Sequence, residues 1–249
     1  MPPQNNPDNT TKAARSAKSP VPSPAGFAAL ARKLLYGHYW IALAAACASL
    51  QTATLLGKPI DTARAAWALM LFGAVLMLYN AHRYWGEAGE EQARFAQLPK
   101  STARLNMLIG ALLSALGGLG CCYFGTLAFS PAMLLVPAAA WLYLLPFGRW
   151  RLRDLPLLKV PYLAAVWAAA TVCLPAENAH SHWLFAAVAA YICLLTLVFD
   201  VRDAALDQRE GTLTWARLLG DVPTICLSVF GLLLWAALVP AAALRLSAL

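Results

Sequence analysis

Charged side chains are scarce in this sequence. Asp, Glu, Lys and Arg make up 12% of its residues, whereas ordinary soluble domains carry about 25%. Acidic residues are fewer than basic ones, with 12 Asp and Glu against 19 Lys and Arg, and 60% of the chain is hydrophobic. Because so few charges cannot solvate so apolar a surface, the composition excludes an ordinary soluble domain. It predicts an all-α integral membrane protein.

Paired cysteines are missing as well. No two of the six cysteines are spaced as CxxC, so the chain lacks that common mark of zinc and dithiol redox sites. All six fall inside or at the edges of apolar stretches, where free cysteine packs as a small hydrophobe. We therefore interpret them as packing residues; they are Cys47, Cys121, Cys122, Cys173, Cys193 and Cys226.

The start of the chain lacks the apolar core of a signal peptide. Residues 1–24 are rich in Pro, Ser and Asn, which predicts a disordered cytoplasmic tail. Residues 25–36 have apolar side chains at helical spacing, with Arg32 and Lys33 on the flank. This pattern predicts an interfacial amphipathic helix that lies along the membrane surface.

Long apolar runs are abundant. A bilayer is crossed by about 20 apolar residues, and the breakers Gly and Pro separate stretches of roughly that length. They predict a single transmembrane domain over residues 37–249, a polytopic bundle of about seven transmembrane helices. The expected spans are 37–56, 62–80, 104–123, 127–146, 160–175, 183–199 and 221–244.

Basic residues predict the orientation. All but Lys58, Arg64 and Arg245 precede the first span or follow the second, fourth and sixth. Since Lys and Arg mark the cytoplasmic side, we expect a cytoplasmic N-terminus, an outer C-terminus and, most simply, a bacterial inner membrane. The basic residues are spread through loops beside the spans, which favours contact with anionic lipid over nucleic acid.

Three of the few acids stand together after the sixth span, at Asp200, Asp203 and Asp207. Spacings of three and four place them within about 60° of one another on a helix. Carboxylates on one face repel unless a cation lies between them, and oxygen-only ligands suit Mg²⁺, which binds through a few carboxylates and substrate phosphates. They are the predicted catalytic and Mg²⁺-binding residues. The alternative is a solvated charged patch.

The stretch DVRDAALDQREGTL, closing on Leu219-Gly220, resembles the second aspartate motif of UbiA-type intramembrane prenyltransferases. The resemblance extends over about 60–220 in the order of spans and loops. It implies a UbiA-like helical fold and transfer of an isoprenyl group from an isoprenyl diphosphate to a hydrophobic acceptor. Mg²⁺ would neutralise the diphosphate leaving group.

The family's first aspartate motif is degenerate here. Asn80 matches, but Ala81, Tyr84 and Ala88 occupy the aspartate positions. Two replacements are open. Carboxylates one turn further along could bind the metal, namely Glu87, Glu90 and Glu91; alternatively, Arg83 with His82 could bind the diphosphate directly, because guanidinium offers a fixed fork of donors.

The diphosphate contacts predicted overall come from three cytoplasmic segments. They are Asn80, Arg83, Arg149, Lys159 and Arg202, with Arg151 and Arg153 as further basic candidates. Aromatic faces could line the substrate cavity and stabilise an allylic cation, with ordinary packing as the alternative for each. The candidates are Tyr84, Trp141, Tyr143, Tyr162 and Trp167.

The sequence therefore predicts a divergent, Mg²⁺-dependent membrane prenyltransferase that acts on an isoprenyl diphosphate and a hydrophobic, aromatic or lipid-like acceptor. The alternative keeps the fold without turnover, as a membrane scaffold or an isoprenoid- or quinone-binding subunit. The resembling family has about nine helices and this chain predicts about seven, so a partner subunit could cover the open side of the bundle.

Overall fold

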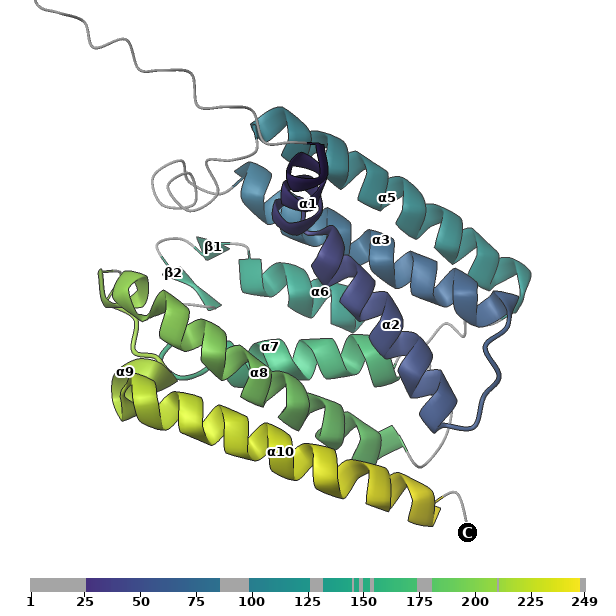
Figure 1. Cartoon of the computed structure of the whole chain (residues 1–249). Helices are drawn as coiled ribbons and strands as arrows, with labels where there is room; N and C mark the ends of the chain where they lie inside the picture. The colour runs from purple at the N-terminus through teal and green to yellow at the C-terminus, as the bar shows by residue number, and fades with distance from the viewer. Residues whose placement is uncertain are drawn as a thin grey trace, which may run out of the picture.

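The computed structural model describes residues 26–85, 99–125, 132–144, 146–147, 150–152, 155–173, 181–209 and 211–246. This part of the chain is helical apart from a minimal hairpin, in which β1 (Pro146–Phe147) pairs antiparallel with β2 (Trp150–Arg151). Each segment predicted to span the membrane forms a helix (Figure 1). These helices are α2 (Tyr39–Leu55), α3 (Thr62–Trp85), α5 (Lys100–Tyr123), α6 (Ala132–Leu144), α7 (Lys159–Ala168) continued by η2 (Ala169–Cys173), α8 (Ser181–Arg209) and α10 (Asp221–Leu246).

Four of these helices are long and apolar enough to cross a bilayer. Their apolar segments are Thr62–Trp85, Lys100–Tyr123, His182–Ala205 and Asp221–Leu238. The apolar parts of α2, α6 and α7 with η2 are shorter, at Tyr39–Leu55, Leu134–Tyr143 and Lys159–Val172. Even the 17 residues of α2 rise only about 26 Å, against a hydrocarbon core of about 30 Å. The described chain is thus an all-helical membrane protein with four candidate spans.

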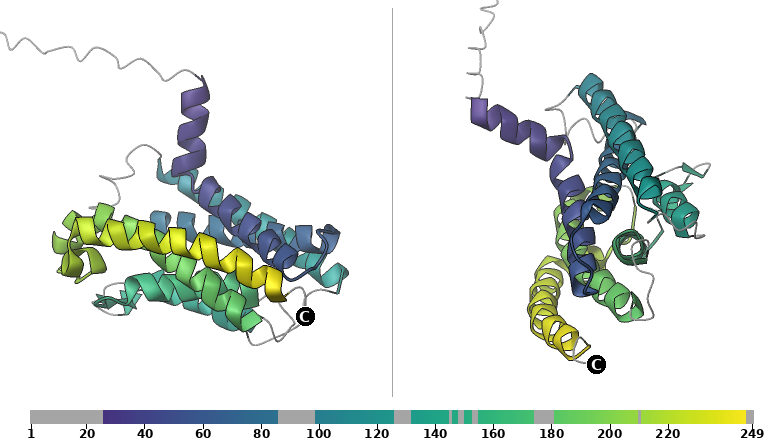
Figure 2. Two further views of the ribbon diagram at one scale, coloured as in Figure 1. Left: turned by 60° about the horizontal axis from the view of Figure 1, so that its bottom comes forward. Right: turned by 90° about the vertical axis from the view of Figure 1, so that its right-hand side faces the viewer.

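Two further helices flank the long ones. The segment expected to lie on the membrane surface forms α1 (Gly26–Tyr36), which projects from the rest of the protein in both views of Figure 2. Its position at an interface stays a prediction. The short α9 (Trp215–Leu219) lies between α8 and α10.

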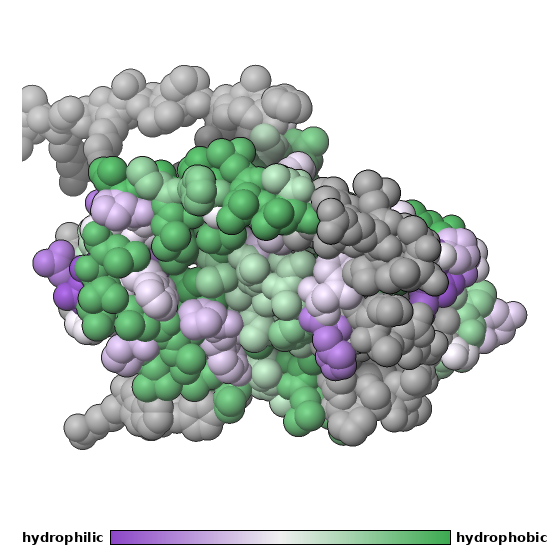
Figure 3. Space-filling view, turned by 90° about the horizontal axis from the view of Figure 1, so that it is seen from below, coloured by the Kyte–Doolittle hydropathy of each residue, from purple (hydrophilic) through white to green (hydrophobic). Residues whose placement is uncertain are grey.

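The helices pack as two groups. One group consists of α2, α3 and α5, in which α3 packs against both others; in the second, α7 and α10 pack on α8. The two groups meet where α2 contacts η2. Figure 3 shows the face on the α10 side, which is largely hydrophobic in the described residues. Large side chains of α10 are exposed, among them Val222, Phe230, Leu233 and Leu238, as expected for a surface that faces lipid.

The contact between α3 and α5 is one of backbone against backbone. A Cβ atom added to Gly73 would lie 2.2 Å from the Ser114 amide nitrogen, and one added to Gly117 would lie 2.3 Å from that of Met70. Only glycine permits this approach. Small residues at such crossings are typical of helix pairs in membranes, where close packing replaces the hydrophobic effect as the source of association.

The contact between α8 and α10 uses side-chain hydrogen bonds instead. Ser228 Oγ donates to the Leu194 carbonyl at 2.6 Å, and Trp235 Nε1 donates to the Ala187 carbonyl at 2.7 Å. The Trp235 ring also packs on Tyr191, with 4.9 Å between ring centroids. Polar side chains thus join these two apolar helices.

One end of the bundle carries most of the described basic residues. The C-termini of α3 and α8 meet the N-termini of α5, α7 and α10 at this end, on the left in Figure 1. We call it the basic end, after Arg83, Lys100, Arg104, Lys159, Arg202 and Arg217. At the opposite end, Asp61 caps α3 by accepting a hydrogen bond from the Arg64 amide at 2.9 Å. That amide, with the nearby guanidinium, holds the pKa of Asp61 below its usual value.

Candidate functional site

Gly211 fixes the local geometry of the site. It has a left-handed backbone with φ 76°, and it ends α8 with two hydrogen bonds, from its own amide to the Gln208 carbonyl and from the Thr212 amide to the Asp207 carbonyl. This is the Schellman arrangement that glycine favours. The chain then reverses alongside α8, so that the Trp215 amide donates to Asp200 Oδ2 at 3.2 Å.

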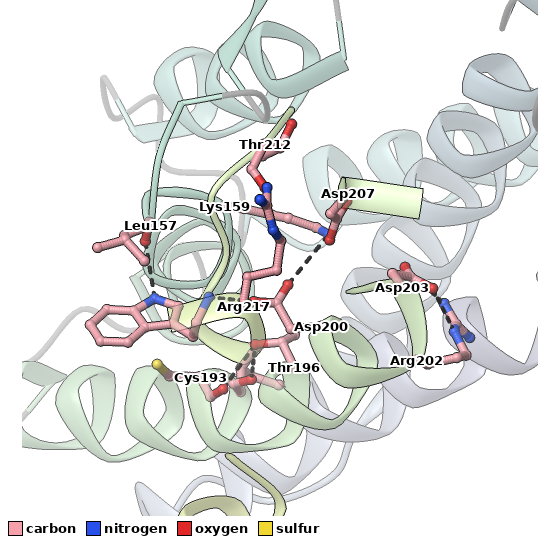
Figure 4. Close-up of polar contacts among 12 residues, drawn as sticks. Leu157, Lys159, Cys193, Thr196, Asp200, Arg202, Asp203, Asp207, Thr212 and Arg217 are labelled. Atoms are coloured by element: carbon pink, nitrogen blue, oxygen red, sulfur yellow. Dashed lines mark hydrogen bonds and ion pairs between the residues drawn. The ribbon is translucent and has the colours of Figure 1, made fainter. Parts of the chain in front are cut away.

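Two of the three predicted aspartates converge on one lysine (Figure 4). Lys159 Nζ lies 3.3 Å from Asp200 Oδ1 and 3.1 Å from Asp207 Oδ2. The side chains are 1% exposed for Asp200, 8% for Asp207 and 24% for Lys159. We call these three residues the aspartate–lysine cluster. It joins the start of α7 to the last turns of α8 and lies at the basic end.

Asp200 keeps one oxygen without a hydrogen bond. Among the described residues, its Oδ1 atom is within ion-pair distance of Lys159 but has no partner of hydrogen-bond geometry, and the buried Thr214 hydroxyl has none either. Lys159 instead directs its hydrogen bond to Asp207. The ammonium therefore balances one of the two carboxylate charges, and Asp200 Oδ1 remains a buried acceptor.

Asp203 does not join the other two aspartates. Its carboxylate accepts two hydrogen bonds from Arg202, at 2.9 Å and 3.3 Å, and the Arg202 guanidinium also lies over the Phe199 ring at 5.0 Å. Positions 200 and 207 are two turns apart and nearly eclipsed, whereas position 203 is rotated by about 60°. That rotation is enough to turn Asp203 and Arg202 away from Lys159.

Two residues predicted to bind diphosphate hold the corner between α1 and α2. Asn80 is fully buried, and its Nδ2 donates to the carbonyls of Gly37 at 3.0 Å and Leu76 at 2.9 Å. Arg83 Nη1 donates to the Tyr36 carbonyl at 2.9 Å. Ala81, at a degenerate aspartate position, is buried in the same region. These contacts are those of residues that anchor a helix corner.

Tyr84 lies elsewhere, in an open hollow of about 410 Å³ at the start of α5. The other lining residues are Lys100, Ser101, Arg104, Leu105 and Leu108. Six predicted candidates lie outside the described residues: Glu87, Ala88, Glu90, Glu91, Arg149 and Arg153. For Arg151 the structure describes the backbone, in β2, and not the side chain.

The predicted cavity aromatics take part in helix packing. The rings of Tyr143 and Tyr162 stack at 5.9 Å with an interplanar angle of 11°, and the Tyr162 hydroxyl donates to the Ala139 carbonyl at 2.9 Å. This pair joins α6 to α7. Trp141 similarly contacts Trp85 across α6 and α3, with centroids 6.0 Å apart. Trp167 is half-buried in α7, and its carbonyl accepts a hydrogen bond from Thr171.

The sequence reasoning missed the residues that hold the cluster in place. Trp215 Nε1 donates to the Leu157 carbonyl at 3.1 Å, and the Leu157 amide donates to the Leu213 carbonyl at 3.0 Å. Leu157 has a left-handed backbone with φ 58°. Arg217 runs beside the cluster and donates to the Thr212 carbonyl (Figure 4). The TLTWAR stretch directly after Gly211 contains Trp215 and Arg217 and was the sequence feature that could have indicated them.

The side chains predicted to bind Mg²⁺ are Asp200, Asp203 and Asp207. Within the described chain, no three His, Cys, Asp or Glu side chains group closely enough to hold a metal ion. Two carboxylates with substrate phosphates are a common Mg²⁺ environment, but here an ammonium already lies between them, and Asp203 is turned away. This arrangement does not fit a resident Mg²⁺ ion. Metal dependence of the protein stays a prediction.

No known protein family, curated protein or solved structure matches this chain. The likeness to UbiA-type enzymes thus rests on the aspartate motif and on the order of spans and loops.

Proposed function

We propose that this protein is a divergent UbiA-type membrane prenyltransferase, which transfers an isoprenyl group from an isoprenyl diphosphate to a hydrophobic acceptor. The observation that carries the proposal is the aspartate–lysine cluster. Three ionisable side chains meet at the end of a membrane-length apolar helix, and Asp200 lies within that apolar segment. Ionisable groups are costly at such positions and are usually kept for function.

The proposal includes an orientation. With α2, α6 and α7 also crossing, the seven apolar helices alternate in direction, and the basic end faces the cytoplasm of a bacterial inner membrane. An isoprenyl diphosphate has an apolar tail and an anionic head. Such a molecule suits a bundle whose exposed helix faces are apolar and whose polar cluster lies at one end beside basic side chains.

The cluster offers a contact for the diphosphate. An ammonium has three N–H donors, and Lys159 faces two carboxylates while keeping about a quarter of its side chain exposed. A phosphate oxygen can take the remaining donor, and Arg217 lies alongside. In the reaction, the allylic C–O bond breaks and its electron pair leaves with the diphosphate. The acceptor then forms a bond to the allylic carbon and loses a proton.

A second function, binding without turnover, is favoured by a specific observation. Asn80 is the one matching residue of the degenerate first motif, and Arg83 was predicted to take over from its missing aspartates. Both side chains donate to carbonyls of the α1–α2 corner. Because these side chains donate to backbone carbonyls, fewer of their N–H groups are available to bind a diphosphate. The alternative is therefore a scaffold or subunit that holds an isoprenoid or quinone in the membrane, with a partner subunit on the open side.

The two functions are separated by turnover. The full chain, purified in detergent, is incubated with isoprenyl diphosphates of several lengths, with and without Mg²⁺, and released diphosphate is measured together with binding. An enzyme should bind the isoprenyl diphosphate and release diphosphate. A binding subunit should bind it without releasing diphosphate. Lys159→Met removes the proposed phosphate contact and should weaken binding, whereas Lys58→Met, at the opposite end, is the matched control and should not.

Absence of both binding and release in well-folded wild-type protein would refute the prenyltransferase proposal. Binding without release, together with a co-purified isoprenoid or quinone found by lipid mass spectrometry, would establish the alternative.

A further inference from the structure

We propose that Lys159 is the resident cation of the aspartate site: its ammonium, in place of a divalent metal ion, holds the carboxylates of Asp200 and Asp207 together. The site gains affinity for divalent ions only when this ammonium is removed. The inference concerns the same site as the proposed function and deepens it. Its test measures metal binding and folding, so it is independent of turnover.

The distances are those of an ammonium site. Lys159 Nζ lies 3.1 Å from Asp207 Oδ2, within hydrogen-bond range, and 3.3 Å from Asp200 Oδ1, within ion-pair distance. A Mg²⁺ ion needs its oxygens at about 2.0–2.1 Å in near-octahedral order. The two carboxylates would have to close in, and further ligands would have to replace Asp203, which is bonded to Arg202.

Burial favours a cation at this position. The Asp200 and Asp207 side chains are 1% and 8% exposed, and a buried charge without a partner is strongly unfavourable. Lys159 supplies this partner from within the chain. A tethered ammonium is present at high effective concentration and loses no translational freedom on binding, so it competes well against a metal ion from solution.

The surrounding backbone holds Lys159 in position. Its neighbour Leu157 is fixed by two hydrogen bonds to the segment after Gly211, one from the Trp215 indole and one to the Leu213 carbonyl. In the same segment, the Trp215 amide donates a hydrogen bond to Asp200. One short stretch of chain thus positions both the ammonium and one of its carboxylates, as expected for a built-in ion pair.

The test uses the full chain in detergent and Mn²⁺ as the probe, followed by electron paramagnetic resonance, in wild type, Lys159→Met and Lys159→Arg. We expect wild type and Lys159→Arg to bind no Mn²⁺ at the site, and their thermal midpoints to be unchanged by EDTA. Lys159→Met should unfold about 6–20 °C lower, as for loss of one partner of a buried pair. Mn²⁺ should restore part of that loss, and Asp207→Asn in the same background should abolish the restoration.

Wild-type protein that binds one Mn²⁺ per chain, and loses it in Asp200→Asn or Asp207→Asn, would overturn the inference. So would a folded Lys159→Met with an unchanged midpoint and no Mn²⁺ affinity. If Lys159→Met alone does not fold, Lys159→Met with Asp200→Asn and Asp207→Asn removes all three charges and should fold. The wild-type Mn²⁺ measurement then decides. A protein that binds no isoprenyl diphosphate would refute the proposed function and leave these outcomes unchanged.

Discussion

Lys159 Nζ and Asp207 Oδ2 lie 3.1 Å apart and join the first residue of α7 to the last turns of α8. The contact matters because α7 and most of α8 are apolar, and this buried pair with Asp200 lies where α8 becomes polar.

Asp207→Asn and Asp203→Asn should differ in stability. Asp207→Asn removes the buried carboxylate that accepts the Lys159 hydrogen bond, while Asp200 remains as a second anion, and it should cost about 1–3 kcal/mol. Asp203 is 16% exposed and pairs with Arg202, which is 63% exposed, so its loss should cost less. Thermal unfolding of the two variants in the same detergent tests this. Equal midpoints would contradict the separation of Asp203 from the cluster.

Gly211→Ala should disturb the site through the backbone. A left-handed φ costs a non-glycine residue about 1–2 kcal/mol, and the turn at Gly211 brings Trp215 to Asp200. Gly57→Ala is the matched control, because Gly57 also has a left-handed φ and open space around its α-carbon. Both variants should lose similar stability, and only Gly211→Ala should lower affinity for isoprenyl diphosphate. Equal affinity in the two would show that the turn does not position the site.

Gly117→Ala should weaken the α3–α5 contact. Its new Cβ would lie 2.3 Å from a backbone atom of α3, which cannot rotate away, so we expect a loss of about 1–3 kcal/mol. The neighbouring Gly118→Ala is the control, since its Cβ would meet only the Met70 sulfur at 3.8 Å. Urea or thermal unfolding of both variants measures the difference. A neutral Gly117→Ala would refute the backbone contact.

Asn80→Ala should act on folding rather than on ligand binding. It removes the 3.0 Å hydrogen bond to the Gly37 carbonyl and leaves that carbonyl a longer one from Asn106 at 3.5 Å, and a poorly satisfied buried group costs about 1–3 kcal/mol. If the role of Asn80 is to hold the α1–α2 corner, the folded fraction should bind isoprenyl diphosphate with wild-type affinity. Isothermal titration of protein purified by size exclusion tests this. Loss of binding in correctly folded Asn80→Ala would return Asn80 to the diphosphate site.

Composition and apolar runs predicted the helices well, because the need to match a bilayer sets both hydrophobicity and segment length. The end of the sixth span was predicted less accurately. The membrane span was expected to finish at residue 199, whereas the apolar segment of α8 extends to Ala205. The helix continues to Arg209, as the helical spacing of the aspartates predicted, because DVRDAALDQR contains no helix breaker before Gly211. The change from apolar to polar marks an exit from lipid, which need not coincide with the end of a helix.

The partners of the aspartates could not be predicted from spacing alone. Helical periodicity correctly brings Asp200 and Asp207 to one side, but the cation that joins them comes from α7, and its approach depends on the turn at Gly211 and on Leu157. Asn80 illustrates the converse. Its match to a motif concerns residue type, whereas its hydrogen bonds depend on the fold of the α1–α2 corner, which the sequence around residue 80 does not encode.

The glycine contact between α3 and α5 bears on how the protein is made. Because it joins neighbouring helices through their backbones, it can form as soon as the second of them leaves the ribosome and enters lipid. The ion pair of Lys159 must wait until all of α8 has been synthesised. During translation, the N-terminal hairpin is therefore ready to serve as the surface on which the later helices assemble.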